Sequence, residues 1–399
     1  MPPRQHHPTR ESAPGSTAAL RTANQQRVID VLRGLGVEEP EDGPESTQAS
    51  LARATGLAPA TVSNIVRELA AADLVETEPG SGRRGTVVRV ARQAGLVAGV
   101  DFGHSHVSVA LGDLAGRLVG ERRRPLAPTH GYAEGLALAS RLLAEIRAET
   151  DGTTPLRTIG LGLPAPVVDD VVRSSAILPG WVGVNARQAA AQVFGCEVHV
   201  ENDANLGAIA EHRRGAGRGH SSVVFVKISS GVGAGLILAG HLFRGAGGSA
   251  GEIGHVTLDE QGPVCRCGSR GCLEAYASTL TVQAMMAGQM PGATIDEIVV
   301  AAGEQNVGAL RALEDAGVHV GWGLAAVVNL LDPDLVVVGG DMARAGDLLL
   351  DSVRLGLRRH ALDTVASTPV VASGLDERAS LVGAVLLAAE RTELFTAAD

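Results

Sequence analysis

The most constraining feature of this sequence is a change of pattern near Gly95 that divides the chain into two unlike parts. Before Gly95, helical apolar periods are followed by two β-rich runs, whereas after it short strand patterns alternate with helical ones. Such alternation is typical of α/β architecture, in which helices cover the faces of a sheet. With 399 residues, 45% of them apolar, the chain is long enough for at least two hydrophobic cores. We therefore expect an N-terminal domain followed by a separate α/β part.

The N-terminal part carries the pattern of a helix-turn-helix. Apolar residues recur at helical spacing up to Leu35, and two more helical patterns, 48–55 and 59–72, are separated by three residues. The last of these patterns has one apolar face, made of Val62, Ile65, Val66 and Leu69. Two β-rich runs within 76–90 then flank a tip rich in Gly and Arg at 80–85, which predicts a hairpin.

We interpret this pattern as a winged helix-turn-helix DNA-binding domain over residues 21–92, preceded by a flexible tail over residues 1–20. In such a domain one helix enters the major groove, while a basic hairpin tip reaches the DNA backbone or the minor groove. The candidate DNA contacts are four residues of the second helix and two arginines of the tip: Thr61, Ser63, Asn64, Arg67, Arg83 and Arg84. The alternative is a three-helix packing module with a solvated, charged loop.

The charge is distributed unevenly along the chain. The net charge is −10, which by itself argues against a nucleic-acid partner. Residues 1–95, however, hold 11 Arg against 11 acidic residues, so the whole excess of negative charge falls on the remainder. Basic residues are therefore relatively concentrated in the part that we expect to bind DNA.

Composition also restricts the cellular location that we expect. No stretch approaches the roughly 18 uninterrupted apolar residues of a membrane span, and the first 22 residues lack the apolar centre of a signal peptide. We accordingly expect a cytoplasmic protein with no membrane partner. Four cysteines, three of them within eight residues, do not resemble a disulfide framework and favour metal binding.

A second constellation has the composition of a metal site. Three cysteines and a histidine fall within 18 residues: His255, Cys265, Cys267 and Cys272. Thiolates and imidazole in a tetrahedral set are the ligands that Zn²⁺ prefers, and four protein ligands leave no position for a catalytic water. We expect a structural zinc ion here, and the alternative is a chance cluster of reduced side chains.

Two further features suit small-molecule binding. A glycine-rich segment, 229–235, directly follows an apolar strand pattern, and it is either a phosphate-binding loop or a tight turn between strands. Carboxylates and amides suited to sugar hydroxyls occur at Asn202, Asp203, Glu252 and Glu274, with His255 near Glu252 in sequence. A single Asp in such a site can also act as a general base, whereas any one of these residues alone is more often a helix cap or a surface charge.

The segment from Gly251 to His255, followed by C-x-C-G-x-x-G-C-x-E from Cys265 to Glu274, resembles the signature stretches of the ROK group of bacterial repressors and sugar kinases. The segments 201–205 and 329–340 are similar to its sugar-binding and nucleotide-side stretches, and the likeness covers about residues 21–390.

The resemblance implies an actin-like, ribonuclease-H-like fold of the sugar-kinase type, with two α/β lobes and a sugar in the cleft between them. The lobes would span residues 95–205 and 206–375, with a C-terminal helix at about 376–392 packing back on the first lobe and the zinc site in the second. By match to the motifs, the sugar would be bound by Asn202, Asp203, Glu252, His255 and Glu274, and Asp203 occupies the general-base position of the kinases.

Departures from the family pattern bear on activity. The kinases carry an Asp-x-Gly-Gly-Thr type loop for the phosphates of ATP, whereas residues 101–105 read Asp-Phe-Gly-His-Ser, so His104 replaces the second glycine and obstructs close backbone approach. We regard Asp101, Gly103, Gly231 and Gly233 as remnants of the phosphate loops, and we expect binding of ATP and Mg²⁺ to be weak or lost.

The leading hypothesis is therefore a sugar-responsive DNA-binding regulator, acting as a repressor on operator DNA and assembled as a homodimer or homotetramer. One alternative is an ATP-dependent hexose or N-acetylhexosamine kinase with a DNA-binding appendage. Another is a DNA-binding chain whose kinase-like part serves only in dimerisation.

Overall fold

The computed structural model describes residues 17–35, 46–80, 85–150, 152–173, 175 and 177–394. They form two compact units: one runs to Gly95, and the other from Leu96 to Arg391. A further piece beginning at Thr392 belongs to the first unit. Among the described residues, no helix combines the length and the apolar character needed to cross a membrane.

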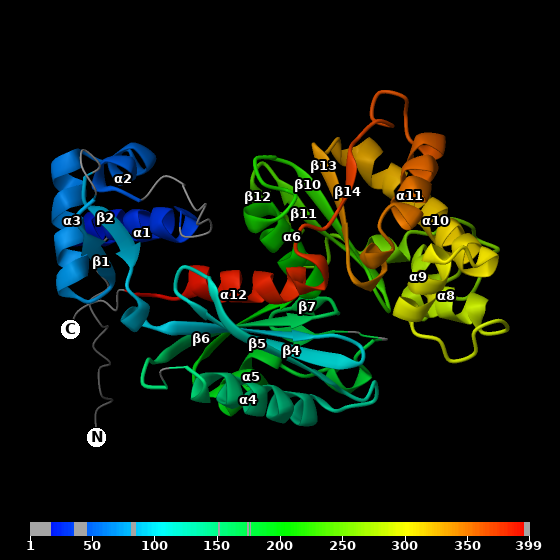
Figure 1. The fold of residues 1–399 in the computed structure, drawn as a ribbon, viewed down its shortest axis with the longest axis horizontal. Coiled ribbons are helices and arrows are strands. Elements are labelled where there is room, and N and C mark those ends of the chain that lie inside the picture. Colours follow the sequence, from blue (N-terminus) through cyan, green and yellow to red (C-terminus); the bar gives the residue numbers. More distant parts are fainter. Residues whose placement is uncertain are drawn as a thin grey trace, which may run out of the picture. The chain divides into compact units, whose positions relative to one another are not determined.

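Among its described residues, the first unit contains three α-helices and a two-stranded sheet (Figure 1). Its elements are α1 (Thr17–Leu35), α2 (Gln48–Thr55), α3 (Pro59–Ala71), β1 (Val75–Glu78) and β2 (Val87–Val90), and the two strands pair antiparallel. The Thr47 side chain caps α2 by accepting a hydrogen bond from the Ser50 amide, and α2 ends at Gly56 in the left-handed region, with φ of 69°. Helix α1 begins inside the segment expected as a tail, because Ala18 and Ala19 favour helix.

The apolar face expected for α3 is confirmed, since its four residues are all at most 4% exposed: Val62, Ile65, Val66 and Leu69. This face packs against α1 and α2, and the Glu68 carboxylate accepts hydrogen bonds from Arg21 and Gln25 of α1. At the other end of α1, the Arg33 guanidinium donates to the Thr392 carbonyl at 3.0 Å. The first unit therefore includes residues that follow the whole second unit in the sequence.

The second unit contains two five-stranded sheets, each at the centre of one lobe (Figure 1). The first sheet has the order β5-β4-β3-β6-β9, with β3 (Leu96–Phe102), β4 (His106–Asp113), β5 (Leu118–Pro125), β6 (Leu156–Leu163) and β9 (Glu197–Asn202). Helices α4 (Tyr132–Ala148) and α5 (Ala186–Phe194) cover one face, and α12 (Ala379–Arg391) lies on the other. The chain thus returns to the first lobe through its last helix.

Helix α12 lies unusually close to this sheet because glycines line the strands beneath it. A Cβ at Gly160 of β6 would meet the Ala384 carbonyl oxygen at 2.0 Å, and one at Gly99 of β3 would meet the Leu381 carbonyl oxygen at 2.9 Å. Helix α12 also crosses α6, where a Cβ at Gly383 would meet the Leu206 carbonyl oxygen at 2.0 Å. Only glycine permits this approach of backbone to backbone.

The second sheet has the order β12-β11-β10-β13-β14, with β10 (Val223–Ile228), β11 (Val232–Leu238), β12 (His241–Leu242), β13 (Leu335–Gly339) and β14 (Val370–Ala372). Helix α6 (Asp203–Arg214) packs on one face, and α10 (Val307–Leu331) and α11 (Asp347–His360) share the core on the other. Three shorter helices, α7 (Glu274–Ala277), α8 (Thr279–Met286) and α9 (Ile295–Gly303), extend this lobe.

The strand patterns expected after Gly95 form strands, including β3, β6, β10 and β13, because each is a short buried run of mostly apolar residues. Two details differ from expectation. The lobe boundary expected at 205–206 falls inside α6. Strand β5 was not expected, because its consecutive arginines at 122–124 lie on an exposed edge strand whose charged side chains hide the strand pattern.

One fully buried carboxylate joins α6 to the segment that leads into α12. Glu211 is 0% exposed, and its two oxygens accept four hydrogen bonds. The donors are the Ala216 amide at 2.8 Å, the Gly374 amide at 3.1 Å, the Leu375 amide at 3.0 Å and the Ser373 hydroxyl. These bonds fix the turn between β14 and α12 relative to α6.

Candidate sugar cleft and metal centre

A cavity of about 1050 Å³ in the second unit is lined by residues from both lobes. It brings together most of the residues expected to bind sugar, phosphate or metal: Asp101, Gly103, Asn202, Asp203, Gly231, Gly233, Glu252, His255, Cys267 and Glu274. The two remaining expected ligands, Cys265 and Cys272, are buried behind the cavity wall and do not line it. A single cleft therefore contains the candidate ligands for a polyol beside the candidate metal centre.

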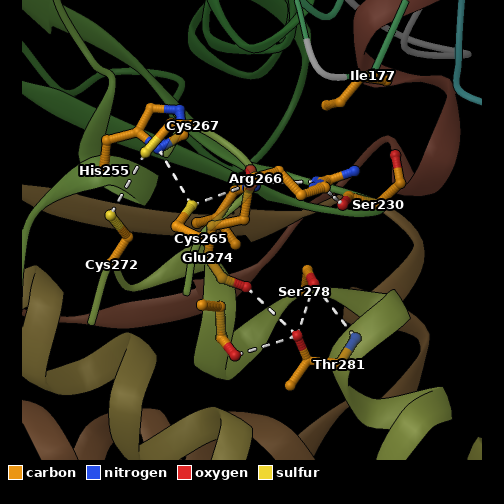
Figure 2. Close-up of polar contacts among 12 residues, drawn as sticks. Ile177, Ser230, His255, Cys265, Arg266, Cys267, Cys272, Glu274, Ser278 and Thr281 are labelled. Atoms are coloured by element: carbon orange, nitrogen blue, oxygen red, sulfur yellow. Dashed lines mark hydrogen bonds and ion pairs between the residues drawn. The ribbon is translucent and has the colours of Figure 1, made fainter. Parts of the chain in front are cut away.

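The four expected metal ligands converge, and their donor atoms all lie within 4.8 Å of one another. The Cys267 and Cys272 sulfurs are 3.7 Å apart, and the Cys265 sulfur is 3.8 Å from His255 Nδ1 (Figure 2). Two sulfurs on one tetrahedral zinc ion would lie about 3.8 Å apart, because each Zn–S bond is about 2.3 Å. The donor set thus fits a four-coordinate Zn²⁺, and backbone turns at Gly268 and Gly271, both with positive φ, wrap the loop around it.

Glu252 and Glu274 each lie close to one of the expected metal ligands, His255 and Cys265 respectively. A Glu252 carboxylate oxygen lies 4.0 Å from His255 Nε2, the ring nitrogen that does not face the cysteines. Burial, with Asp203 and Glu274 nearby, raises the pKa of Glu252 to about 7. Glu274 begins α7, is 6% exposed and accepts a hydrogen bond from the Val232 amide at 3.2 Å.

Asn202 has a local structural role in addition to lining the cleft. Its side-chain oxygen caps α6 by accepting from the amides of Ala204 at 2.9 Å and Asn205 at 3.2 Å. Its side-chain nitrogen donates to the Ala165 carbonyl at 3.3 Å. The structure therefore assigns Asn202 to a helix cap, which directs the following Asp203 into the cleft at the N-terminus of α6.

Asp203 is ion-paired to a residue that the sequence analysis did not select. Lys227 Nζ lies 2.7 Å from Asp203 Oδ2 and 3.0 Å from the Ser380 hydroxyl, which itself donates to the Asp203 carbonyl at 2.9 Å. The Lys227 and Asp203 side chains are only 16% and 10% exposed. The carboxylate in the general-base position is thus already neutralised by an internal ammonium group.

Residues 101–105, the first of the two expected phosphate-loop remnants, leave little free space around their backbone. Gly103 has no room for a side chain, because a Cβ would meet the His106 ring at 2.2 Å. The His104 ring lies against the Ile177 carbonyl, with 3.3 Å between Nδ1 and the oxygen, and lines the cleft as expected. Burial, together with Arg123 and Lys227, lowers the pKa of His106 to about 3, so this ring is neutral.

The second glycine-rich segment is a tight turn between the antiparallel strands β10 and β11, and it faces an arginine from the metal loop (Figure 2). Arg266 lies between two metal ligands, donates to the Ser230 carbonyl and pairs with Glu274 at 3.1 Å. A Cβ at Gly231 would meet the Glu274 carboxylate at 2.8 Å. Arg266, which was not among the expected site residues, thus links the metal loop, the glycine turn and a candidate sugar ligand.

In the first unit, the outer face of α3 presents the residues expected to contact DNA. Asn64 and Arg67 are exposed and hydrogen-bonded to each other at 3.2 Å, while Thr61 and Ser63 are partly buried. The expected wing residues Arg83 and Arg84 lie outside the described residues.

Comparison with known proteins gives a consistent result. Residues 97–391 match the ROK family, and residues 26–84 match the MarR family. The xylose repressor of Bacillus subtilis is 28% identical over 90% of this chain and 95% of its own length. The glucokinase of Thermotoga maritima is 30% identical, over 73% of this chain and 97% of its own length.

A solved structure extends the match over both units. The crystal structure of a ROK family transcriptional regulator, homologous to the Escherichia coli MLC protein, superimposes with a TM-score of 0.75 at 24% identity, covering 94% of this chain and 96% of that one. The expected fold, a winged helix-turn-helix joined to an actin-like domain of the sugar-kinase type, is confirmed.

Proposed function

Because the chain belongs to the ROK family and carries a MarR-type helix-turn-helix, we propose that it is a sugar-responsive DNA-binding transcriptional repressor. The observation that carries this proposal is the extent of the similarity. The match to the xylose repressor spans nearly the full length of both proteins, whereas the match to the glucokinase covers only 73% of this chain. The similarity to the xylose repressor therefore includes both the helix-turn-helix unit and the unit that contains the cleft.

The cleft supplies the chemistry for a sugar effector. The proposed ligands are Asn202, Asp203, Glu252, His255 and Glu274, and all five line the same cavity. Carboxylates accept hydrogen bonds from sugar hydroxyls, and dense hydroxyl groups need several acceptors at once. We expect the sugar to compete with Arg266 for Glu274, since that pair spans the metal loop and the cleft.

Zinc is the metal that we propose for the four-ligand centre. His255, Cys265, Cys267 and Cys272 would hold it, and a closed tetrahedral set would make it structural. Bound zinc would fix the loop that carries Arg266 and would orient the His255 ring next to Glu252.

We propose operator DNA as the macromolecular partner, contacted by Asn64, Arg67 and the neighbouring polar residues of α3, together with Arg83 and Arg84 from the segment of the sequence between β1 and β2. A homodimer or homotetramer would present two helices to two half-sites. Sugar binding would then change operator affinity with a coupling free energy of about 1–3 kcal/mol.

Kinase activity is the less favoured function. Asp203 is held in an ion pair by Lys227, and His104 occupies the loop position at which close approach to a phosphate requires glycine. A kinase assay that detects ADP release with any sugar, and loses it in Asp203→Asn, would restore this alternative.

The direct test is fluorescence anisotropy with labelled DNA from upstream of the gene itself and its neighbours, titrated at low salt with and without a panel of pentoses, hexoses and N-acetylhexosamines. We expect specific binding that one member of the panel weakens. Arg67→Ala should reduce binding, whereas Arg358→Ala, which changes an exposed arginine of α11 in the second unit, should not. Absence of binding to every fragment at low salt would refute the proposal.

A further inference from the structure

Lys227 is the only lysine in the chain, since all 33 other basic residues counted as Lys or Arg are arginine. It is the one charged residue of β10, which otherwise reads Val-Val-Phe-Val and Ile. In the sheet it pairs with two glycines, Gly233 of β11 and Gly339 of β13. Because these paired residues have no side chains, the long Lys227 side chain has room beside the strand, and it lines the cleft.

The ammonium group of Lys227 faces carboxylates from both lobes. Asp203, at the start of α6, is 2.7 Å away, while Asp101 of β3 and Asp341 after β13 act on it electrostatically. Asp101 is 4% exposed, and its Oδ1 has no hydrogen-bond partner among the described residues. Gly162 makes room for that carboxylate, because a Cβ there would lie 2.9 Å from Asp101 Oδ1.

The electrostatic balance of this group keeps the lysine charged. Burial alone lowers the pKa of Lys227, but the Asp203 and Asp101 carboxylates outweigh burial and hold the pKa above its usual range. Burial raises the pKa of Asp101 to about 6, with Lys227 acting in the opposite direction. The carboxylates of Asp101 and Asp203 are therefore stabilised by a nearby positive charge, and the Lys227 ammonium group provides that charge.

We propose that the ammonium group of Lys227 is a built-in counter-ion that takes the place of a divalent cation beside Asp203 and near Asp101, and thereby excludes a metal-bound nucleotide from the cleft. Enzymes that use Mg²⁺ with nucleotides hold the ion through one or two carboxylates and the phosphates. In this cleft the carboxylates of Asp203 and Asp101 already interact with the positive charge of Lys227. A divalent cation that approached these carboxylates would be repelled by the Lys227 ammonium group.

This inference builds on the proposed function, because it gives a physical reason why a kinase-like cleft can bind a sugar without transferring phosphate. Asp203, paired through Oδ2, keeps its other oxygen for accepting a hydrogen bond from a hydroxyl group. Lys227 is thus a residue that determines what the cleft excludes, and it contacts both Asp203 and Ser380 at the junction of α6 and α12.

The test uses the full-length, zinc-loaded protein without sugar or DNA, and MnCl₂ as the probe. Free Mn²⁺ is measured by electron paramagnetic resonance during titration of the wild type, Lys227→Met, Lys227→Arg and the double variant Lys227→Met/Asp203→Asn. We expect Lys227→Met to bind one Mn²⁺ about tenfold or more tightly than the wild type. Lys227→Arg, which keeps the charge, should behave as the wild type, and the double variant should lose the gain.

Thermal melting gives a second measurement on the same samples. Mn²⁺ should raise the melting temperature of Lys227→Met and leave that of the wild type and of Lys227→Arg unchanged. If Lys227→Met folds only when Mn²⁺ is present, that dependence is itself the expected result, and the double variant, which lacks both charges, should fold without the ion. Equal Mn²⁺ affinity in wild type and Lys227→Met, a gain that survives Asp203→Asn, or failure of Mn²⁺ to stabilise Lys227→Met would overturn the proposal. None of these outcomes depends on DNA or sugar binding, so they are separate from the test of the repressor function.

Discussion

Replacing Glu211 by glutamine should destabilise the second unit strongly, even though the two side chains have nearly the same size. Glu211 is completely buried, and each of its oxygens accepts two hydrogen bonds. In Glu211→Gln, one oxygen becomes an NH₂ group that can only donate. The favourable orientation turns the NH₂ group toward Ser373, whose hydroxyl can accept from it and donate to the Asp376 carbonyl instead, so that one fixed donor, the Leu375 amide, faces a donor.

The magnitude follows from these four contacts. A hydrogen bond to a charged acceptor contributes about 1.5–3 kcal/mol, and a buried donor left without an acceptor costs a similar amount. The loss at the Leu375 amide gives about 1.5–3 kcal/mol in the free energy of unfolding. The matched control is Glu390→Gln at the end of α12, where the carboxylate forms a half-exposed pair with Arg213 and should contribute about 1 kcal/mol or less.

Urea unfolding followed by tryptophan fluorescence measures this difference. The chain has two tryptophans, Trp181 and Trp322, and both belong to the second unit, so the signal reports on that unit alone. A loss below about 1 kcal/mol for Glu211→Gln, or a loss equal to that of Glu390→Gln, would refute the reasoning that the four buried hydrogen bonds hold α6 to the turn before α12.

Further predictions concern other parts of the chain. Gly160→Ala should cost about 2–3 kcal/mol in urea unfolding, because its Cβ would meet the Ala384 carbonyl at 2.0 Å; an unchanged midpoint would contradict this. Burial raises the pKa of Asp101 from 3.8 to about 6, so its favourable contribution is present below pH 3.8 and is lost as the pH rises through 6. Asp101→Asn should therefore exceed the wild type in stability by on the order of 3 kcal/mol at pH 8 and by less at pH 5, and an equal difference at both would oppose the assignment. Cys272→Ser should lower bound zinc, measured by elemental analysis, from about one ion per chain to well below one, and full retention would exclude the four-ligand site. Arg67→Ala should weaken DNA binding and flatten its salt dependence by about one phosphate contact, and an unchanged slope would place Arg67 away from the backbone.

Sequence patterns predicted those parts of the molecule in which local chemistry dictates structure. The buried face of α3 follows from its helical period, and the meeting of His255 with three cysteines follows from short spacing and ligand preference. The central strands were evident because they are buried on both faces and are therefore apolar apart from one charged residue each, Asp101 in β3 and Lys227 in β10. Edge strand β5 was not, since three consecutive arginines are tolerated only where the sheet ends.

Several residues of the cleft could not be predicted from the sequence, for a different reason. Lys227, Arg266 and Asp341 act through neighbours from other strands and loops, and no spacing in the sequence reveals that they meet. One signal was available for Lys227: a lone lysine inside an apolar strand immediately before a glycine-rich turn. A charge in such a position must find a partner in the fold, and here that partner is Asp203.

The discontinuity of the first unit has a consequence for how the protein is made. Arg33 and Thr392, which touch in that unit, are 359 positions apart in the chain. During translation the partner of Arg33 is added only after the entire ROK region has left the peptidyl-transferase centre. A ribosome that stalls or terminates early therefore releases a first unit that lacks the contact between Arg33 and Thr392. Every polypeptide that has this contact also contains the complete second unit.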